Sequence, residues 1–432
     1  MSLKNIQMQI FHQQFIRPAG FVRNVATMLV GNIAAQVVAF SAAPVITRLY
    51  TPNDFGVMTY IAAIIGICSV LCCMQYENAI VLPKEEGKAL NVFMLCILCV
   101  SVISMLLLLI VYFWRESLAY LMDKPWIGHW LWFIPAGILV QGLFICLSHI
   151  YARKKQFTSL SIANVISSLS TVSIKIVPGV FFGTSIFWLI TSNICGLLVS
   201  VVLLVWSFLH RDFANIQRFV KRSDIFAVAV EYSKFPKYAI PTGLLNSLSQ
   251  NLPILLFANY FSQDVVGYYG LANIILRKPI TLMGHSLSKV YRQKAAELQY
   301  EGRKLGDSMV KTTLGLIGIG LIPFGLLAVS GSYIFSLVFG ENWAPAGLYA
   351  QILAPWLFMG FVNPPATQVF IVKQDLQFKL FLEITSIVLR GAGITLGVYL
   401  YDSIIVSLIL FSGAGVLTNL IYIRRAFILC KN

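Results

Sequence analysis

Basic side chains lie deep inside long apolar stretches of this sequence. Arg277 and Lys278 lie about thirteen residues into the stretch 265–291, and Arg390 lies about fourteen residues into the stretch 377–400. A charged group at the centre of a membrane costs roughly 2.5 to 3.5 kcal/mol on insertion scales, so it needs a partner, a hydrated cavity or a function. The planar guanidinium of arginine donates charge-assisted hydrogen bonds to phosphate. These residues therefore predict a basic cavity that suits an anion.

Two further basic residues, Lys175 and Arg48, lie closer to the outer ends of their stretches. Both side chains are long enough to reach the membrane interface. Neighbouring residues on a helix point about 100° apart, so at most one of Arg277 and Lys278 is expected to face the same cavity as Arg390. A structural interpretation stays open, in which Arg277 or Lys278 pairs with a backbone carbonyl or with Glu383.

Acidic residues at the same depth are few. Glu383 precedes Arg390 by about two helical turns, so the two side chains share one face of the helix and can form a pair. Glu77 lies near the inner end of the stretch 55–82 and is expected to meet the membrane interface.

Amide side chains and prolines mark two of the stretches. Two amide pairs are spaced four residues apart, Asn32 with Gln36 and Asn246 with Gln250. This spacing places both amides of a pair on one helix face, and we include all four among the candidate binding residues. Pro241 and Pro253 flank the second pair and are the candidate hinges, because a proline removes a helix hydrogen bond and can kink the helix.

No pattern in the sequence assembles a catalytic or metal site. The five histidines are scattered, and seven of the eight cysteines lie inside apolar stretches, where we expect small core residues. There is no phosphate-binding loop, and His285 is expected to be a packing residue. We therefore expect no metal, no cofactor and no enzymatic activity.

The elements that must position these residues are membrane helices. Of the 432 residues 58% are hydrophobic and 11% are charged, so the bilayer is the expected solvent. Lipid offers the backbone no hydrogen-bond partners, so apolar runs of about 20 residues must be helices, and the expected class is all-α. Twelve spans are expected, roughly at 24–49, 55–82, 89–114, 128–152, 158–182, 185–209, 238–260, 265–291, 309–338, 346–371, 377–400 and 403–423.

Basic residues in the connections fall on alternate sides of these spans. The side with the N-terminus has 25 Lys and Arg, and the other side has three, Arg48, Arg115 and Lys124. The positive-inside rule then places both termini in the cytoplasm. The first 23 residues lack the apolar core of a cleavable signal peptide. The net charge of +15 is scattered over loops, so we expect no nucleic-acid partner.

The longest connection on the basic side divides the chain into two sets of six spans. The expected parts are a cytoplasmic lead 1–23, an N-terminal bundle 24–209, a cytoplasmic linker 210–237, a C-terminal bundle 238–425 and a tail 426–432. The polar turns 50–56 and 261–267 resemble each other and both end in a glycine, which indicates a repeat of six spans. Tryptophans near the outer ends of spans predict an interfacial belt, namely Trp114, Trp126, Trp130, Trp188 and Trp343.

Four motifs give the chain a resemblance to a known family. They are Thr47-Arg48-Leu49-Tyr50-Thr51-Pro52-Asn53-Asp54-Phe55-Gly56, Tyr76-Glu77-Asn78-Ala79-Ile80-Val81-Leu82-Pro83-Lys84, Val266-Gly267-Tyr268-Tyr269 and Phe339-Gly340-Glu341-Asn342-Trp343. Over nearly its whole length the chain resembles the Wzx-type polysaccharide flippases of the MATE-like (multidrug/oligosaccharidyl-lipid/polysaccharide) exporter superfamily.

This resemblance implies a V-shaped transporter of two six-helix bundles in the bacterial inner membrane. Such proteins move an isoprenoid-pyrophosphate-linked oligosaccharide to the outer leaflet by alternating access, for O-antigen or capsule synthesis. The expected partners are this lipid-linked oligosaccharide, membrane lipid and other polysaccharide assembly proteins.

The same resemblance implies roles for particular residues. A central cationic cavity would contain Arg277, Lys278 and Arg390, with Arg48 and Lys175 toward its outer mouth. Independently of the resemblance, Glu383 is the candidate coupling acid, because it is one of the few acids at depth. The seventh span differs from the family pattern, because Gln250 and Asn251 stand where relatives often carry charged residues.

Other classes of function stay open. A cation-coupled drug or solute antiporter on the same fold would need deep carboxylates, whereas the deep charge here is mainly basic. A membrane glycan polymerase or ligase would be expected to have a large outer loop, which this sequence lacks. A carrier of the major facilitator type would have an acidic-basic loop between spans 2 and 3, which 83–88 does not match.

Overall fold

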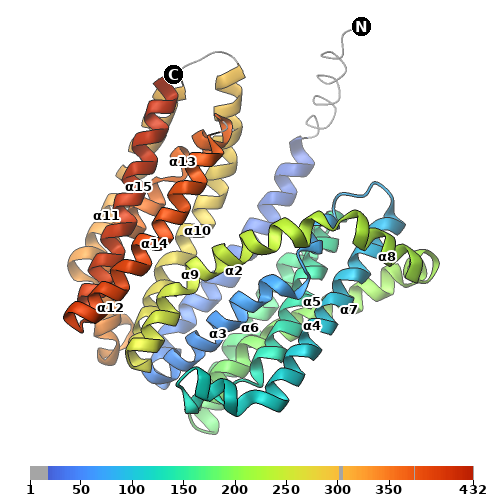
Figure 1. The fold of residues 1–432 in the computed structure, drawn as a ribbon, viewed down its shortest axis with the longest axis horizontal. Coiled ribbons are helices and arrows are strands. Elements are labelled where there is room, and N and C mark those ends of the chain that lie inside the picture. The colour runs from blue at the N-terminus through green and yellow to red at the C-terminus, as the bar shows by residue number, and fades with distance from the viewer. Residues whose placement is uncertain (1–17, 301–304, 374, 432) are drawn as a thin grey trace. The chain divides into compact units, whose positions relative to one another are not determined.

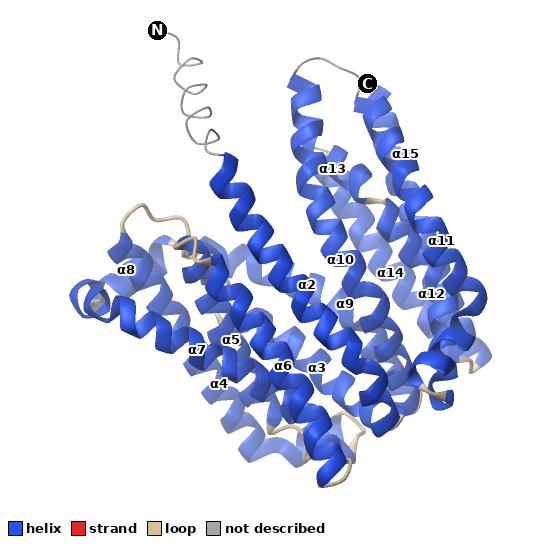
Figure 2. Ribbon diagram, turned by 180° about the vertical axis from the view of Figure 1, so that it is seen from behind, coloured by secondary structure: helices blue, strands red, loops and turns tan. Residues whose placement is uncertain are grey.

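The computed structural model describes residues 18–300, 305–373 and 375–431, and every regular element in these ranges is helical (Figure 1). Figure 2 shows the same helices from behind, joined by short loops. The chain divides into two compact units. Unit 1 comprises the chain up to Ala43 and Ile64–Ser247, and unit 2 comprises Pro44–Ala63 and the chain from Leu248 onward.

Three helices, α2, α3 and α9, cross from one unit to the other, and the boundary between Ala63 and Ile64 lies inside α3. The boundary at Pro44 lies inside helix α2, where the proline lacks the N–H that would continue the helix hydrogen bonding. The boundary after Ser247 lies inside α9, between Pro241 and Pro253. The sequence placed 44–63 in the N-terminal bundle, whereas this segment is part of unit 2.

Unit 1 is built around helix hairpins. Consecutive helices α6 and α7 pack along each other, and α5 packs against both α4 and α7. Besides the first part of α2 (Pro18–Leu49) and the last part of α3 (Pro52–Cys72), the helices that lie entirely in unit 1 are η1 (Tyr76–Ala79), α4 (Glu86–Leu121), η2 (Pro125–Ile127), α5 (Phe133–Arg153), α6 (Phe157–Phe181), α7 (Ile186–Phe219), α8 (Arg222–Glu231) and η3 (Phe235–Ala239).

Unit 2 repeats this hairpin arrangement. Helices α11 and α12 pack together, as do α14 and α15, and α12 also packs against α10 and α15. Its helices are α10 (Gln263–Tyr300), α11 (Leu305–Phe339), η4 (Glu341–Trp343), α12 (Ala344–Val362), α13 (Pro364–Val372), α14 (Leu376–Tyr401), α15 (Ile404–Lys431) and the second part of α9 (Ile240–Tyr260).

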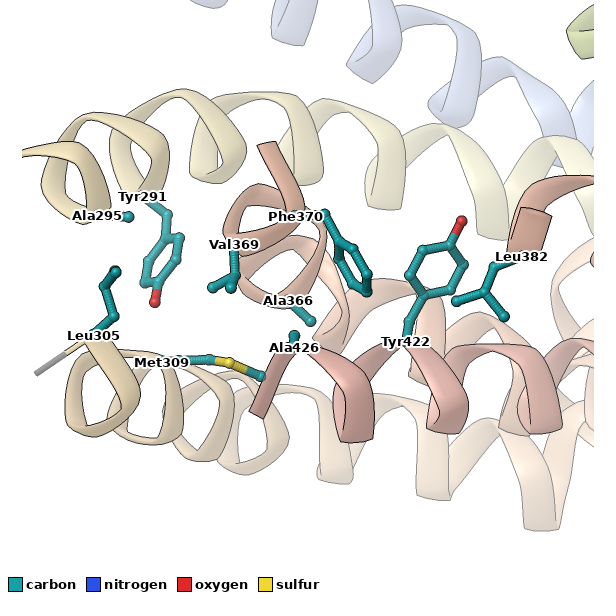
Figure 3. Close-up of a cluster of buried hydrophobic side chains, with 10 residues drawn as sticks. All are labelled: Tyr291, Ala295, Leu305, Met309, Ala366, Val369, Phe370, Leu382, Tyr422 and Ala426. Atoms are coloured by element: carbon teal, nitrogen blue, oxygen red, sulfur yellow. The ribbon is translucent and has the colours of Figure 1, made fainter. Parts of the chain in front are cut away.

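One end of unit 2 is closed by an apolar core that joins five helices (Figure 3). Phe370 of α13 packs edge to face against Tyr422 of α15 and stacks on Phe378 of α14. Tyr291 of α10 and Met309 of α11 lie at the other end of the cluster. Burial of this much aromatic and aliphatic surface fixes the relative positions of these helices.

Trp343 is an internal anchor of unit 2. Its side chain is 1% exposed, its Nε1–H donates to the carbonyl oxygen of Thr47 at 2.8 Å, and its ring packs against Phe55 and Tyr268. The expectation that Trp343 belongs to an interfacial belt is therefore wrong, because its indole N–H has a partner inside the protein. The ring of Trp114, by contrast, is 56% exposed.

The chain is a multi-pass membrane protein. Among the described residues, ten helices are long and apolar enough to cross a membrane. Helices α9 and α10 coincide with the remaining two expected spans but are not among these ten. Several span limits differ from expectation. Among them, α3 ends at Cys72 instead of near 82, α7 continues to Phe219 instead of ending near 209, and a proline pair after Asn363 separates α12 from α13.

Candidate functional site

Arg390 of α14 lies among four helices of unit 2. Its Nε–H donates to the carbonyl oxygen of Ser386, one turn earlier, at 3.1 Å. Its second guanidinium nitrogen lies 3.4 Å from the hydroxyl oxygen of Ser249 on α9. These bonds use two of the five N–H donors of the side chain and fix the direction in which the guanidinium points.

Two aromatic rings complete the surroundings of Arg390. The guanidinium carbon lies 5.6 Å from the ring centre of Trp356 on α12 and 5.8 Å from that of Phe411 on α15. The two rings meet edge to face, with centres 5.0 Å apart. A cation over aromatic faces is stabilised by about 0.5 to 2 kcal/mol. The glycine at 415 makes this arrangement fit, since a Cβ there would overlap the indole ring of Trp356.

A second guanidinium belongs to the same region of unit 2. The charge of Arg277 on α10 acts on Arg390, and both charges act on the phenol of Tyr269. Tyr269 is 1% exposed and packs edge to face on Phe257. The two predicted arginines are therefore brought together, as like charges in a partly buried environment. Like charges repel each other, so an anion placed between them would relieve that repulsion.

The predicted acid Glu383 is directed elsewhere. Its carboxylate is 53% exposed and pairs with Lys379, one turn earlier, at 3.7 Å. Within the described part of the chain Arg390 forms no ion pair with a carboxylate. The structure therefore does not contain the predicted pair between Glu383 and Arg390.

The remaining predicted residues are divided between the units. In unit 1, the Nδ2–H of Asn164 on α6 donates to Oδ1 of Asn32 at 2.9 Å, so Asn32 joins α2 to α6. Gln36, one turn later, is half-buried, and its Oε1 lacks a hydrogen-bond partner among the described residues. Lys175 is half-buried on α6.

The amide pair on α9 is separated by the unit boundary, with Asn246 in unit 1 and Gln250 in unit 2, both exposed. Arg48 is exposed at the end of α2 in unit 2. The side chain of Lys278 lies outside the described residues. Binding roles for these residues stay predictions.

Sequence reasoning missed the partners of Arg390. Ser249 and Phe411 are ordinary residues in an apolar helix, and no signal in the sequence distinguishes them. Trp356 did carry a signal, because it lies in the middle of a span next to Pro355, away from the ends where membrane tryptophans gather.

Known proteins agree with this arrangement of helices. The family model described as "Polysaccharide biosynthesis protein" matches residues 45–347, which is more than half of the chain. The chain belongs to this family. Its relatives include the lipopolysaccharide biosynthesis protein WzxC of Escherichia coli strain K12, which is 25% identical over 390 residues, or 83% of this chain and 74% of that protein. The capsular polysaccharide biosynthesis protein CapF of Staphylococcus aureus is 22% identical, covering 77% of this chain and 81% of that protein.

Solved structures identify the fold of this family member as MATE-like. The lipid II flippase MurJ in an inward closed conformation matches with a TM-score of 0.71 and 12% identity, over 94% of this chain and 89% of that one. An inward-facing multidrug resistance MATE transporter matches with a TM-score of 0.64 and 13% identity, over 94% and 93% of the two chains.

Proposed function

We propose that this protein is a flippase that moves a lipid-linked oligosaccharide across the membrane for the synthesis of a surface polysaccharide. The observation that carries the proposal is the guanidinium of Arg390, held by two aromatic rings and without a carboxylate partner among the described residues. Family membership and the likeness to a lipid II flippase support it.

The chemistry of Arg390 favours a phosphorylated lipid head. A pyrophosphate is multiply charged and loses its hydration when it enters a membrane protein, so it requires fixed cations. Arg390 offers N–H donors that Ser249 and Ser386 do not use, and Arg277 adds a second charge. An isoprenoid pyrophosphate carrying the glycan is therefore the substrate we assign, with both arginines in contact with its phosphates.

The transport cycle we propose is alternating access, in which unit 1 and unit 2 rock against each other while the isoprenoid chain stays in lipid. Pro241 and Pro253 lie on either side of the unit boundary in α9, and Pro241 lies two residues after the end of the π-helical turn η3. Because a proline lacks an N–H, it leaves a helix carbonyl without its usual donor and lowers the resistance to bending there. These two residues are the hinges we propose.

The membrane we assign is the bacterial inner membrane, with both termini in the cytoplasm as the basic loops predict. The activity is transport without covalent chemistry, so no catalytic residue or cofactor is assigned. Glu383 stays a candidate coupling acid, although its exposed pairing with Lys379 places it at a surface of unit 2.

Reconstituted flipping tests the role of Arg390. The measurement uses proteoliposomes and a fluorescent isoprenoid-pyrophosphate disaccharide, whose arrival in the opposite leaflet is followed by quenching. Arg390→Ala should lower the rate about tenfold or more, since a charge-assisted hydrogen bond contributes about 1.5 to 3 kcal/mol. Arg390→Lys should recover part of the rate, because it restores the charge without the planar fork.

Arg424→Ala is the matched control, because Arg424 is exposed near the end of α15. Its rate should equal that of the wild type. A normal rate for Arg390→Ala in correctly folded protein would remove Arg390 from the mechanism. No flipping by the wild type of any isoprenoid-pyrophosphate glycan, including the lipid-linked repeat unit of the host, would remove the proposed function itself.

A further inference from the structure

The turn after α3 contains a buried carboxylate that is not part of the site around Arg390. Glu77 lies in η1, beyond Cys72 where the spanning helix ends. Its side chain is only 8% exposed, and its Oε2 has no hydrogen-bond partner among the described residues. An ionised carboxylate in such a place is costly, so the group must pair with a cation or take up a proton.

The backbone before Glu77 is bent to hold it inward. Met74 and Gln75 adopt left-handed conformations, with φ of 51° and 60°. The Nε2–H of Gln75 donates to the carbonyl oxygen of Val70 at 3.2 Å, which closes the end of α3. The neighbouring Ile80 is fully buried. Left-handed geometry costs about 1 to 2 kcal/mol at a non-glycine residue, so this turn persists because its surroundings hold it.

Among the described residues, the imidazole of His149 on α5 is the basic group whose charge favours the ionised form of the Glu77 carboxyl. The Nδ1 atom of His149 lies 2.9 Å from the carbonyl oxygen of Ile145, so Nδ1 carries the donated proton and Nε2 is the ring atom left for other contacts. The guanidinium of Arg153 is nearby but donates to the carbonyl oxygen of Ile80 at 3.1 Å.

The other titratable groups around Glu77 are neutral thiols and a phenol. Thiols bond only weakly, so they do not replace the water that a carboxylate loses on burial. Those whose charge would act on Glu77 are Cys72 at the end of α3, Cys73 directly after it, and Cys96 and Cys99 from α4, and Tyr76 precedes Glu77 in η1. Burial raises the pKa of the Glu77 carboxyl above its ordinary value of 4.5, and its own backbone amide and His149 offset part of this shift.

This turn also supports the segment that leads from unit 1 into unit 2. The hydroxyl of Tyr76 donates to the carbonyl oxygen of Ala229 on α8 at 3.0 Å. At the start of α9, a Cβ on Gly243 would lie 2.8 Å from the side chain of Val70, and the hydroxyl of Ser247 donates to the carbonyl oxygen of Gly66 at 3.1 Å. The turn and the end of α3 are therefore in contact with α8 and with the first part of α9.

We propose that Glu77, with His149 beside it, is a proton-binding site whose proton is the coupling ion of the transport cycle. One proton from water adds to the carboxylate and makes it neutral, and the same proton returns to water when the turn opens. The coupling role rests on the proposed flippase function, whereas proton binding itself does not.

Infrared spectroscopy tests proton binding without any substrate. The full-length protein in lipid nanodiscs is titrated from about pH 4 to about pH 8, a range that spans the ordinary glutamate and histidine pKa values. The wild type should retain the carbonyl stretch of one protonated carboxyl well above the ordinary glutamate titration. Glu77→Gln should lose this band, and Glu85→Gln, which removes an exposed acid from the same connection, should keep it.

His149→Gln tests the electrostatic effect of the imidazole on Glu77. If His149 only packed against its neighbours, the midpoint of the carboxyl band would not change in this variant. Loss of the imidazole should move the titration of the same band upward by about one pH unit or more, because an opposite charge no longer favours the ionised form. An unchanged midpoint in folded His149→Gln, or a band that survives in Glu77→Gln, would overturn the proposal.

Flipping by the same variants separates coupling from proton binding. With a pH gradient, wild-type proteoliposomes should flip the fluorescent isoprenoid-pyrophosphate disaccharide faster than without one. Glu77→Gln should flip at a rate that no longer responds to the gradient. A gradient response retained in Glu77→Gln would overturn the coupling role, while the absence of wild-type flipping would count against the flippase function and leave the infrared result standing.

Discussion

Gly56 of α3 and Gly267 of α10 pack against each other's helices in a reciprocal way. A Cβ on Gly56 would overlap the carbonyl oxygen of Gln263, and a Cβ on Gly267 would overlap that of Pro52. Each contacted residue stands one turn before the opposite glycine. The two polar turns that resemble each other in the sequence therefore meet in unit 2, where the helices that follow them approach backbone to backbone.

This contact predicts that alanine is not tolerated at either position. Gly56→Ala or Gly267→Ala must push the two helices apart, and overpacking of this kind costs about 1 to 3 kcal/mol. The melting temperature of the purified protein in detergent should fall in both variants. Gly284→Ala on the same helix α10 is the control, because no atom of the described residues lies within 4 Å of its Cβ position. An unchanged melting temperature for Gly267→Ala would contradict the close approach.

The sequence predicted the helices well because membrane helices follow from hydropathy, and lipid leaves the backbone no alternative. The prediction failed where a helix ends inside an apolar run. The apolar run 55–82 gives no sign that α3 ends at Cys72, since the left-handed turn at Met74 and Gln75 is formed by residues without glycine. Such a turn is stabilised by packing with distant helices, which a local pattern does not contain.

The candidate site was predicted in part for the same reason. The cost of charge in lipid marked Arg390 and Arg277 directly from the sequence. Their partners Ser249 and Phe411 come from helices far apart in the chain, so only the fold brings them together. Glu77 was expected at the interface because of its place near the end of a span, and its burial became evident only from the turn that holds it.

A substitution at Gly415 should displace the indole of Trp356 without altering Arg390 itself. Gly415→Ala places a methyl group on the ring of Trp356, which must move away from Arg390. The rate of flipping should fall by roughly two- to thirtyfold, the equivalent of a lost cation–π contact of about 0.5 to 2 kcal/mol. At Gly413 on the same helix, no atom of the described part of the chain lies within 4 Å of the Cβ position, so Gly413→Ala should retain the wild-type rate. Equal rates for the two variants would show that the position of Trp356 does not matter.

The raised pKa of Glu77 predicts a particular dependence of stability on pH. When the pKa of an acid is raised in the folded state, its contribution to stability is full below the unfolded pKa and is lost as the pH rises through the folded pKa. Glu77→Gln cannot ionise and does not suffer this loss. The variant should match the wild type near pH 4 and become relatively more stable toward pH 8, by about 1.4 kcal/mol for each unit of the shift.

Thermal unfolding in detergent at a series of pH values measures this difference. Glu85→Gln is the comparison, since it removes an exposed acid from the same connection. A wild type that gains stability relative to Glu77→Gln as the pH rises would mean that the ionised carboxylate is the favoured form, which contradicts the effect of burial.

The docking of the linker on unit 1 depends on one buried amide. Asn91 of α4 is 3% exposed, and its Nδ2–H groups donate to the carbonyl oxygens of Gly87 at 2.9 Å and Phe219 at 3.0 Å. Its Oδ1 accepts the backbone N–H of Lys221 at 3.3 Å. The side chain thus provides hydrogen-bond partners for a backbone carbonyl at the end of α7 and a backbone N–H at the start of α8.

A second linker contact is exposed and should contribute much less. Lys88 of α4 pairs with Glu231 of α8 at 2.7 Å, but the side chains are 36% and 47% exposed. Surface ion pairs contribute about 0 to 1 kcal/mol, whereas leaving buried backbone groups without a partner costs about 1 to 3 kcal/mol each. Asn91→Ala should therefore loosen the linker far more than Lys88→Ala.

Limited trypsin digestion of the protein in nanodiscs measures this, because Lys221 and Arg222 offer cleavage sites at the turn itself. Cleavage there should be roughly five- to a hundredfold faster in Asn91→Ala than in the wild type, since the local opening equilibrium rises with the lost free energy. Lys88→Ala should change the rate by about fivefold at most. Faster cleavage in Lys88→Ala than in Asn91→Ala would mean that the ion pair, and not the buried amide, holds the linker on unit 1.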